Sequence, residues 1–107
     1  MNILYILIGG LITYYIYSMP KPLIANEKSF TLYHWVSCGH CKVFLPTYNA
    51  LGSSYNGITI RQVERSQNNE YSVSGFPTMV YRDGKGGIEE YDGARDINSL
   101  KSYLASK

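Results

Sequence analysis

The strongest constraint in this 107-residue chain is the spacing of its two cysteines, Cys38 and Cys41, which only two residues separate. A disulfide between them closes too small a loop to hold a fold together as the bridges of disulfide-rich secreted domains do. An aromatic and β-branched segment, residues 30–36, precedes the pair, and an apolar helical pattern, residues 41–51, follows it. The sequence therefore places both sulfurs where a strand ends and a helix begins.

The composition is that of one globular domain rather than a disordered chain. Hydrophobic residues make up 45% of the sequence and charged residues 17%, an ordinary globular balance. The formal net charge is only +2, and the lysines and arginines are scattered rather than gathered into a basic run. We therefore expect no nucleic-acid partner.

The remaining patterns predict a small α/β domain with the element order β-α-β-α-β-β-α. Alternation, turn residues and helical spacing give its elements. They are a strand at 30–36, a helix at 41–51, a strand at 58–63, a short helix at 67–71, strands at 78–82 and 88–91, and a last helix capped by Asp96 or Asn98.

Residues 3–19 form a run of 17 residues without a charge, with tyrosines near both ends. As a helix this run would be roughly 26 Å long at about 1.5 Å per residue, near the lower limit for crossing a bilayer. Interfacial aromatics belong at such positions, and Pro20 and Pro22 would stop the helix.

We interpret this run as an uncleaved N-terminal transmembrane anchor, with its orientation left open. A cleaved signal peptide is the first alternative, although the run has no basic residue before it and no convincing cleavage site after it. A buried core helix is the second, although it would show a polar stripe. The predicted division is an anchor or signal peptide at 1–19, a linker at 20–28 and a folded domain at 29–107.

The sequence Cys38-Gly39-His40-Cys41 carries the chemistry. Cys38 would lie at a helix N-terminus, where exposed N–H groups favour its thiolate, and only the thiolate attacks a disulfide. Cys41, one turn further on, could then resolve the mixed disulfide. His40 adds a titratable cation, or at least a donor, near the Cys38 sulfur.

Two other uses of the cysteine pair stay open. The pair could be an inert structural disulfide, or half of a zinc or iron–sulfur site. Because the only other soft donors are His34 and His40, a metal site would need a second chain. We expect no metal and no other cofactor.

Residues 33–42, which read YHWVSCGHCK, resemble the active-site region of protein disulfide isomerase domains in the thioredoxin superfamily. The likeness returns at Phe76-Pro77-Thr78 and extends over most of residues 30–106. It implies a minimal thioredoxin fold without the family's first strand and helix, since the linker leaves no room for them.

The resemblance also implies roles for residues outside the motif. Pro77 would be cis and face the cysteine pair, and the backbone of Phe76 would pair with an extended substrate. Pro46 would kink the first helix. Arg95 and Lys42 would modulate the cysteines, although Arg95 by sequence alone is equally a surface charge beside a helix start.

Two positions depart from the family pattern. The tryptophan that usually precedes the first cysteine is Ser37 here, and Trp35 lies two residues earlier. The buried acid that usually serves proton transfer at the second cysteine is Leu32, which is also simply a good core residue in a strand. The leucine puts efficient proton transfer at Cys41 in question.

These observations predict a thiol–disulfide oxidoreductase of the protein disulfide oxidase or isomerase type, its direction left open. The alternative is a thioredoxin-like binding or structural module of a membrane or virion complex. Expected partners are cysteine-containing protein substrates, an upstream thiol oxidase or reductase, and a membrane entered by residues 3–19. An endoplasmic reticulum or other oxidising lumen is favoured over the cytosol, and the membrane or virion of a large DNA virus is a further setting.

Overall fold

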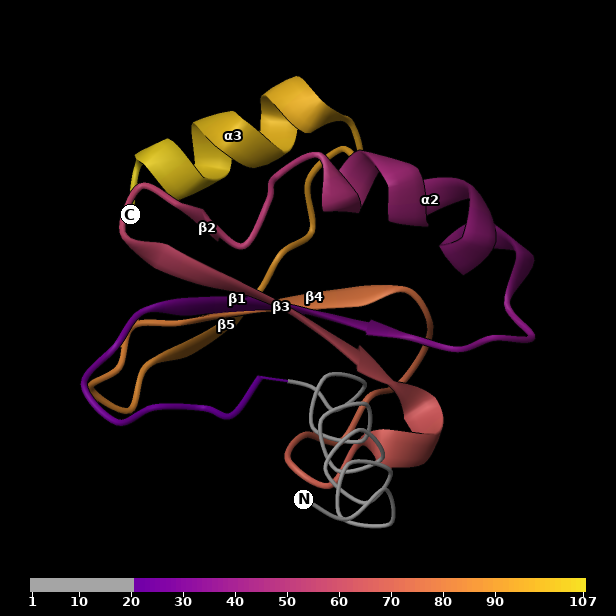
Figure 1. Cartoon of the computed structure of the whole chain (residues 1–107), viewed down its shortest axis with the longest axis horizontal. Helices are drawn as coiled ribbons and strands as arrows, with labels where there is room; N and C mark the ends of the chain where they lie inside the picture. The colour runs from indigo at the N-terminus through magenta and orange to yellow at the C-terminus, as the bar shows by residue number, and fades with distance from the viewer. Residues whose placement is uncertain (1–20) are drawn as a thin grey trace, which may run out of the picture.

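A five-stranded mixed sheet forms the centre of the molecule, with the strand order β2-β3-β1-β4-β5. The computed structural model describes residues 21–107 (Figure 1). Its elements in chain order are β1 (Ser29–His34), α2 (Gly39–Asn49), β2 (Ser54–Tyr55), β3 (Ile58–Glu64), the 3-10 turn η1 (Arg65–Gln67), β4 (Thr78–Arg82), β5 (Ile88–Glu90) and α3 (Ile97–Ala105).

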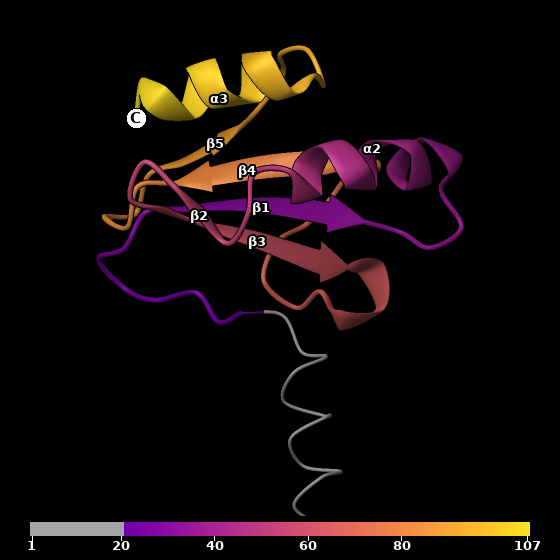
Figure 2. The same cartoon turned by 45° about the horizontal axis from the view of Figure 1, so that its top comes forward.

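The central strand β1 sets where the connecting loops meet. It is parallel to β3, with His34 opposite Glu64, and antiparallel to β4, with Tyr33 opposite Thr78. The carboxyl ends of β1 and β3 and the start of β4 therefore lie at one edge of the sheet (Figure 2). Two connections gather there: the β1–α2 loop, and the β3–β4 connection, which begins with η1 and ends in the loop that leads into β4.

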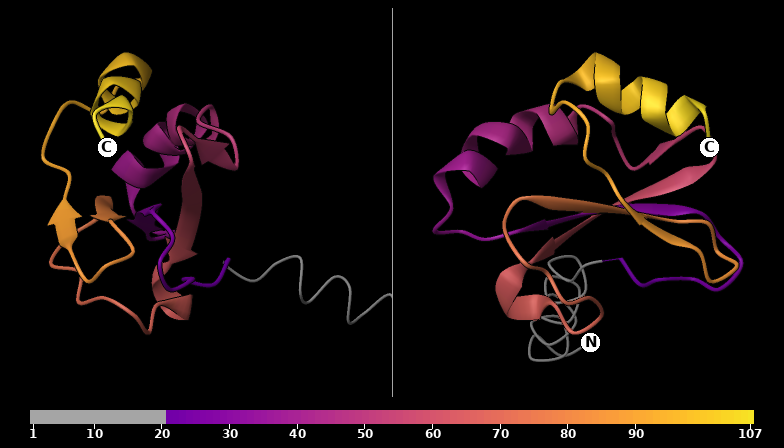
Figure 3. Two further views of the ribbon diagram at one scale, coloured as in Figure 1. Left: turned by 90° about the vertical axis from the view of Figure 1, so that its left-hand side faces the viewer. Right: turned by 180° about the vertical axis from the view of Figure 1, so that it is seen from behind.

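Both helices, α2 and α3, cover the same face of the sheet (Figure 3). The residues they bury form the main apolar core: Phe30, Leu32, Phe44, Tyr48, Leu51, Ile58, Ile60, Met79, Tyr81, Leu100 and Leu104. Tyr48 fastens α2 to the sheet, since its hydroxyl lies 2.9 Å from the carbonyl oxygens of both Phe30 and Arg61. This packing fixes α2, and so the helix start, relative to β1 and β3.

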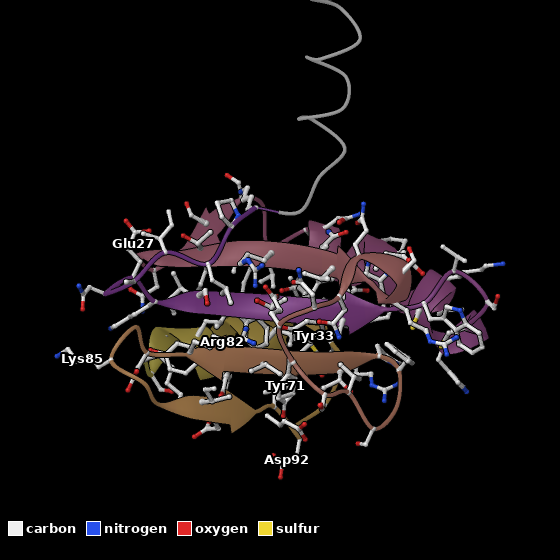
Figure 4. The ribbon with its side chains drawn as sticks, turned by 90° about the horizontal axis from the view of Figure 1, so that it is seen from below. Glu27, Tyr33, Tyr71, Arg82, Lys85 and Asp92 are labelled. Carbon is white, nitrogen blue, oxygen red and sulfur yellow. The ribbon has the colours of Figure 1, made fainter. Side chains whose placement is uncertain are left out.

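No helix covers the opposite face among residues 21–107 (Figure 4). A smaller apolar cluster of Tyr33, Val63 and Val80 lies there. Next to it Arg61, only 2% exposed, forms a two-pronged ion pair with Glu70 at 2.8 and 3.0 Å. This face is therefore held by polar contacts as well as by apolar burial.

The short helix predicted at residues 67–71 is wrong. The chain makes only the 3-10 turn η1 there, and residues 68–77 contain no helix. The side-chain oxygen of Asn68 accepts the backbone N–H groups of Glu70 at 3.1 Å and Tyr71 at 3.3 Å. Such local side-chain bonds compete with helix formation.

The other differences lie at the ends of elements. Helix α2 begins at Gly39 rather than Cys41, because Cys38 itself caps it, and it contains the expected Pro46. The short edge strand β2 is not predicted by the sequence. Asp96 caps the last helix as expected, accepting the Ser99 N–H at 2.9 Å.

Two predictions concern the region before β1. Residues 21–28, the described part of the predicted linker, contain neither strand nor helix. The predicted anchor at 3–19 lies outside the described residues. Within residues 21–107, no helix is long and apolar enough to cross a membrane.

Candidate active site

Cys38 is the N-cap residue of α2. A turn delivers it there from β1, closed by a 2.9 Å hydrogen bond from the Cys38 N–H to the Trp35 carbonyl. Its backbone is extended, and its Sγ accepts the N–H of Cys41 at 3.3 Å. The sulfur thus replaces the hydroxyl or carboxylate oxygen that usually fills this role at a helix start.

The two thiols are both free, and their pKa values are shifted in opposite directions. The pKa of Cys38 is lowered, first by a hydrogen bond from the Cys41 thiol, then by the N–H groups of Cys41 and His40 and by the charge of Arg95. Burial raises the pKa of Cys41, which is 1% exposed, to about 11. Cys38 is therefore the thiol that ionises first, and Cys41 stays protonated near neutral pH.

The Phe76–Pro77 segment faces the pair, as the resemblance implies. The Phe76–Pro77 peptide bond is cis, and Pro77 is buried. The Cys38 thiol lies 3.7 Å from the Phe76 carbonyl oxygen, within donating distance for sulfur. The loop before β4 thus brings a backbone carbonyl next to the reactive sulfur, although the two residues lie 38 positions apart in the sequence.

The residues predicted to modulate the cysteines lie around the start of α2, and each acts on Cys38 in a different way. Arg95 is exposed but close enough for its charge to lower the pKa of both cysteines, and it lines a small hollow with His40. His40 reaches Cys38 through its backbone N–H; within residues 21–107 no hydrogen bond joins its imidazole to the sulfur. Lys42 is exposed and donates its backbone N–H to the Cys38 carbonyl at 3.2 Å, while Gly39 opens the helix.

Leu32 is fully buried in the main core, as expected for a leucine in β1. Its side chain packs in the cluster that contains Phe44 and Tyr48, and it offers no group that could take up a proton. The buried acid that the family usually has at this position is therefore replaced by an apolar side chain. Cys41, with its raised pKa, lacks that proton acceptor.

Sequence reasoning missed the contacts of Trp35. Its ring lies 6.2 Å from that of Phe76, and the Arg65 guanidinium lies 4.7 Å from the indole centre. The pattern of residues around Arg65 gives no sign of this, since a cation after a strand is usually solvated.

A metal site also finds no support within residues 21–107, where no three His, Cys, Asp or Glu residues gather.

The family model for thioredoxin matches residues 21–106. The chain belongs to the thioredoxin family. It is 35% identical over 79 residues to protein disulfide-isomerase tigA of Aspergillus niger, covering 65% of this chain and 22% of that protein. It is 38% identical over 91 residues to protein disulfide-isomerase like 2-2 of Arabidopsis thaliana, covering 78% of this chain and 20% of that one.

These relatives support membership in the thiol–disulfide oxidoreductase class, although the chain spans only about a fifth of their length.

Solved structures show the same fold. The J-Trx1 fragment of ERdj5 superposes with a TM-score of 0.68 at 20% identity, over 76% of this chain and 43% of that one. Fasciola hepatica thioredoxin gives 0.60 at 24% identity, over 77% and 82%.

Proposed function

We propose that this domain exchanges disulfides with protein substrates, as an oxidase or isomerase, through Cys38 and Cys41. One observation carries the proposal: the Cys38 sulfur caps α2 with a lowered pKa, directly beside the Phe76 carbonyl. An attacking thiolate and a backbone carbonyl that could accept a hydrogen bond from a bound peptide are thus found together.

The oxidising reaction balances with these two residues alone. A substrate thiolate attacks Sγ of Cys38 in the disulfide form, which breaks the Cys38–Cys41 bond and forms a mixed disulfide. The Cys41 thiolate that leaves takes up a proton. A second substrate thiolate then attacks the substrate sulfur of the mixed disulfide, so the substrate gains a disulfide and the Cys38 thiolate is released.

The acidity of Cys38 favours the oxidising direction. Every group that stabilises its thiolate stabilises the reduced form of the pair, and so makes the disulfide form a stronger oxidant. The N–H groups of Cys41 and His40 and the charge of Arg95 all act in this sense. Net oxidation then needs an upstream thiol oxidase to restore the disulfide, and isomerisation needs the reduced form.

Renaturation of scrambled ribonuclease by the full-length chain tests the proposal. The wild type should restore ribonuclease activity, Cys38→Ser should abolish it, and Cys41→Ser should accumulate mixed disulfides with the substrate. Alkylation should label Cys38 with a midpoint below the free thiol value of about 8.5. Faster labelling of Cys41 than of Cys38, or renaturation by Cys38→Ser, would contradict the assigned roles.

A pair of His40 variants separates backbone from side chain. His40→Pro removes the N–H that faces Cys38, whereas His40→Ala keeps it. The potential of His40→Pro should fall by about 30 mV for each tenfold loss of thiolate stability, and that of His40→Ala should fall less. Equal shifts would show that the imidazole, not the N–H, stabilises the thiolate.

We also propose that residues 3–19 anchor the domain in a membrane that faces an oxidising lumen. The uncharged run and its tyrosines motivate this proposal. The full-length protein should resist extraction at alkaline pH. A mature protein cut near residue 20 or 25 would instead indicate secretion.

A further inference from the structure

A groove of about 690 Å³ opens beside the cysteine pair. Trp35 and Val36 of the β1–α2 connection line one side, and residues 64–67 at the end of β3 and in η1 line the other. The two sides meet because β1 and β3 are parallel, so that both connections leave the same edge of the sheet (Figure 2).

The groove lies next to the site of the chemistry, and Trp35 links the two. Cys38 Sγ contacts the Phe76 carbonyl at 3.7 Å, the Phe76 ring lies 6.2 Å from that of Trp35, and Trp35 forms the groove wall. Trp35 and Cys38 are the ends of one hydrogen-bonded turn, so their Cα atoms are within about 7 Å. An extended peptide covers that distance in about two residues.

The wall on the Trp35 side is apolar and open to solvent. Trp35 is 36% exposed and Val36 is 63% exposed, next to the reactive cysteine rather than scattered over the surface. Exposed apolar side chains gathered beside a site favour a contact with a partner.

The two charged side chains that line the groove, Glu64 and Arg65, differ in the partners they already have. The Glu64 carboxylate accepts hydrogen bonds from the Ser66 hydroxyl, from the N–H of Ser66 at 2.6 Å and from the N–H of Val36 at 3.4 Å, which lower its pKa in that order of effect. Arg65 forms no ion pair with any residue in 21–107; its contact is the Trp35 ring. The groove therefore offers an unpaired cation beside an apolar wall.

We propose that this groove is a specificity subsite for the polypeptide substrate, taking a large apolar residue next to an acidic residue, two to three positions from the reactive cysteine. The proposal rests on the function proposed above. The apolar side chain packs on Trp35 and Val36, and the carboxylate pairs with Arg65. Glu64, whose hydrogen bonds favour its ionised form, repels a second carboxylate on its side of the groove by its negative charge.

Peptides that carry cysteine as a mixed disulfide with neutral thiopyridine test the subsite with the reduced full-length chain. The Cys38 thiolate attacks the peptide sulfur and releases thiopyridine, and Cys41 then displaces the peptide thiol. The series places Leu–Glu, Leu–Lys or Ser–Glu two to three residues before or after the cysteine. For one of the two placements, Leu–Glu should react about fivefold to tenfold faster than Leu–Lys or Ser–Glu.

Variants show which side chain recognises each residue of the peptide. Arg65→Gln should bring the Leu–Glu to Leu–Lys ratio close to one and keep the preference for leucine over serine. Trp35→Ala should remove the leucine preference. Lys101→Gln on α3, an exposed lysine outside the groove, is the matched control and should keep both ratios.

An unchanged charge ratio in Arg65→Gln, or an equal loss in Lys101→Gln, would overturn the subsite. The mixed disulfide of free cysteine with thiopyridine has no flanking residues to bind. Failure of the wild type to react with that probe would contradict the redox function itself, which separates the two proposals.

Discussion

The two faces of the central sheet are stabilised by different means. The face under α2 and α3 buries a continuous apolar cluster, whereas the opposite face buries only Tyr33, Val63 and Val80 as its apolar centre. Among residues 21–107, loops and the segment before β1 lie on that second face in place of helices (Figure 4). The difference shows that this thioredoxin domain replaces helix packing with side-chain hydrogen bonds on one of its sides.

The polar face forms a connected network. Arg61 holds Glu70 with two hydrogen bonds and also donates to Thr31 at 2.7 Å. The Tyr33 hydroxyl donates to Glu70 at 2.9 Å and accepts from Arg82 at 2.7 Å. Each buried polar atom in this set has a partner, which is the condition for burying charges without a large penalty.

The two active-site cysteines belong to the helix face. Cys41 is buried on the inner side of α2, and Cys38 caps the same helix. The position of the reactive pair therefore depends on the apolar core beneath α2, while the polar face contributes to stability from the other side. Variants on each face can measure these contributions separately.

The largest effect is expected for Leu100→Ala in α3. Leu100 is fully buried in the main core, so the variant loses apolar burial and leaves a cavity. Unfolding in denaturant should show a loss of about 3–4 kcal/mol. Leu100→Met, which nearly conserves volume, should lose less than about 1.5 kcal/mol. Equal losses in the two variants would indicate that the helix face is loosely packed.

The next effect is expected for Leu32→Glu, which restores the family's acid inside the apolar core. Burial raises the carboxyl pKa and leaves the acid without a partner, so we expect a loss of about 3 kcal/mol. With a pKa of about 11, only about one Cys41 in 10⁴ is ionised at pH 7, so a nearby base should speed resolution by at least about tenfold.

Leu32→Gln is the control for this variant, because it has the shape of glutamate but does not titrate. It should lose similar stability and gain no rate in stopped-flow measurement of mixed-disulfide resolution. A rate gain in both variants would mean that polarity or loosened packing, not proton transfer, limits Cys41.

A smaller effect is expected for Glu70→Gln on the polar face. The amide oxygen can still accept from the nearly inaccessible Arg61, but the charge that compensates the guanidinium is lost. We expect a loss of about 2 kcal/mol near neutral pH, below the range for removing a partner outright. A change indistinguishable from zero would show that the network is solvated in solution.

The same variant predicts a pH dependence. Burial alone would raise the pKa of Glu70, but hydrogen bonds from Arg61 and Tyr33 and the charges of Arg61 and Arg82 lower it overall. Its contribution is therefore complete above the unfolded value of about 4.3 and is lost as pH falls through the lower folded value. The difference in unfolding free energy between wild type and Glu70→Gln should shrink below about pH 4.

The smallest effect is expected for Glu89→Gln at the edge of the sheet. Glu89 pairs with Lys107 at 3.2 Å, but its side chain is half exposed and solvent screens the pair. Thermal unfolding should be nearly unchanged, which makes this variant the control for Glu70→Gln. A loss equal to that of Glu70→Gln would remove the distinction between a buried network and a surface pair.

Local sequence determined the elements that carry the chemistry. Three predictions rested on residues close together in the sequence: a strand at β1, a helix at α2, and the pair Cys38 and Cys41 where the strand leads into the helix. All three are confirmed. The Asp96 cap and the hairpin of β4 and β5 follow the same logic. The helix predicted at 67–71 failed because side-chain bonds from Asn68 outweighed a weak pattern.

Tertiary structure alone decided which distant groups meet. Arg65 beside Trp35 joins two separate connections, and Glu70 beside Arg61 joins a loop to β3. Phe76 beside Cys38 is also a distant contact; the family resemblance implied it, but no local pattern did. These contacts form because parallel β1 and β3 and antiparallel β4 bring those connections to one edge and one face of the sheet. No periodicity encodes strand order, so no local pattern could reveal the groove or the network; the free energy that selects them comes from packing the whole sheet.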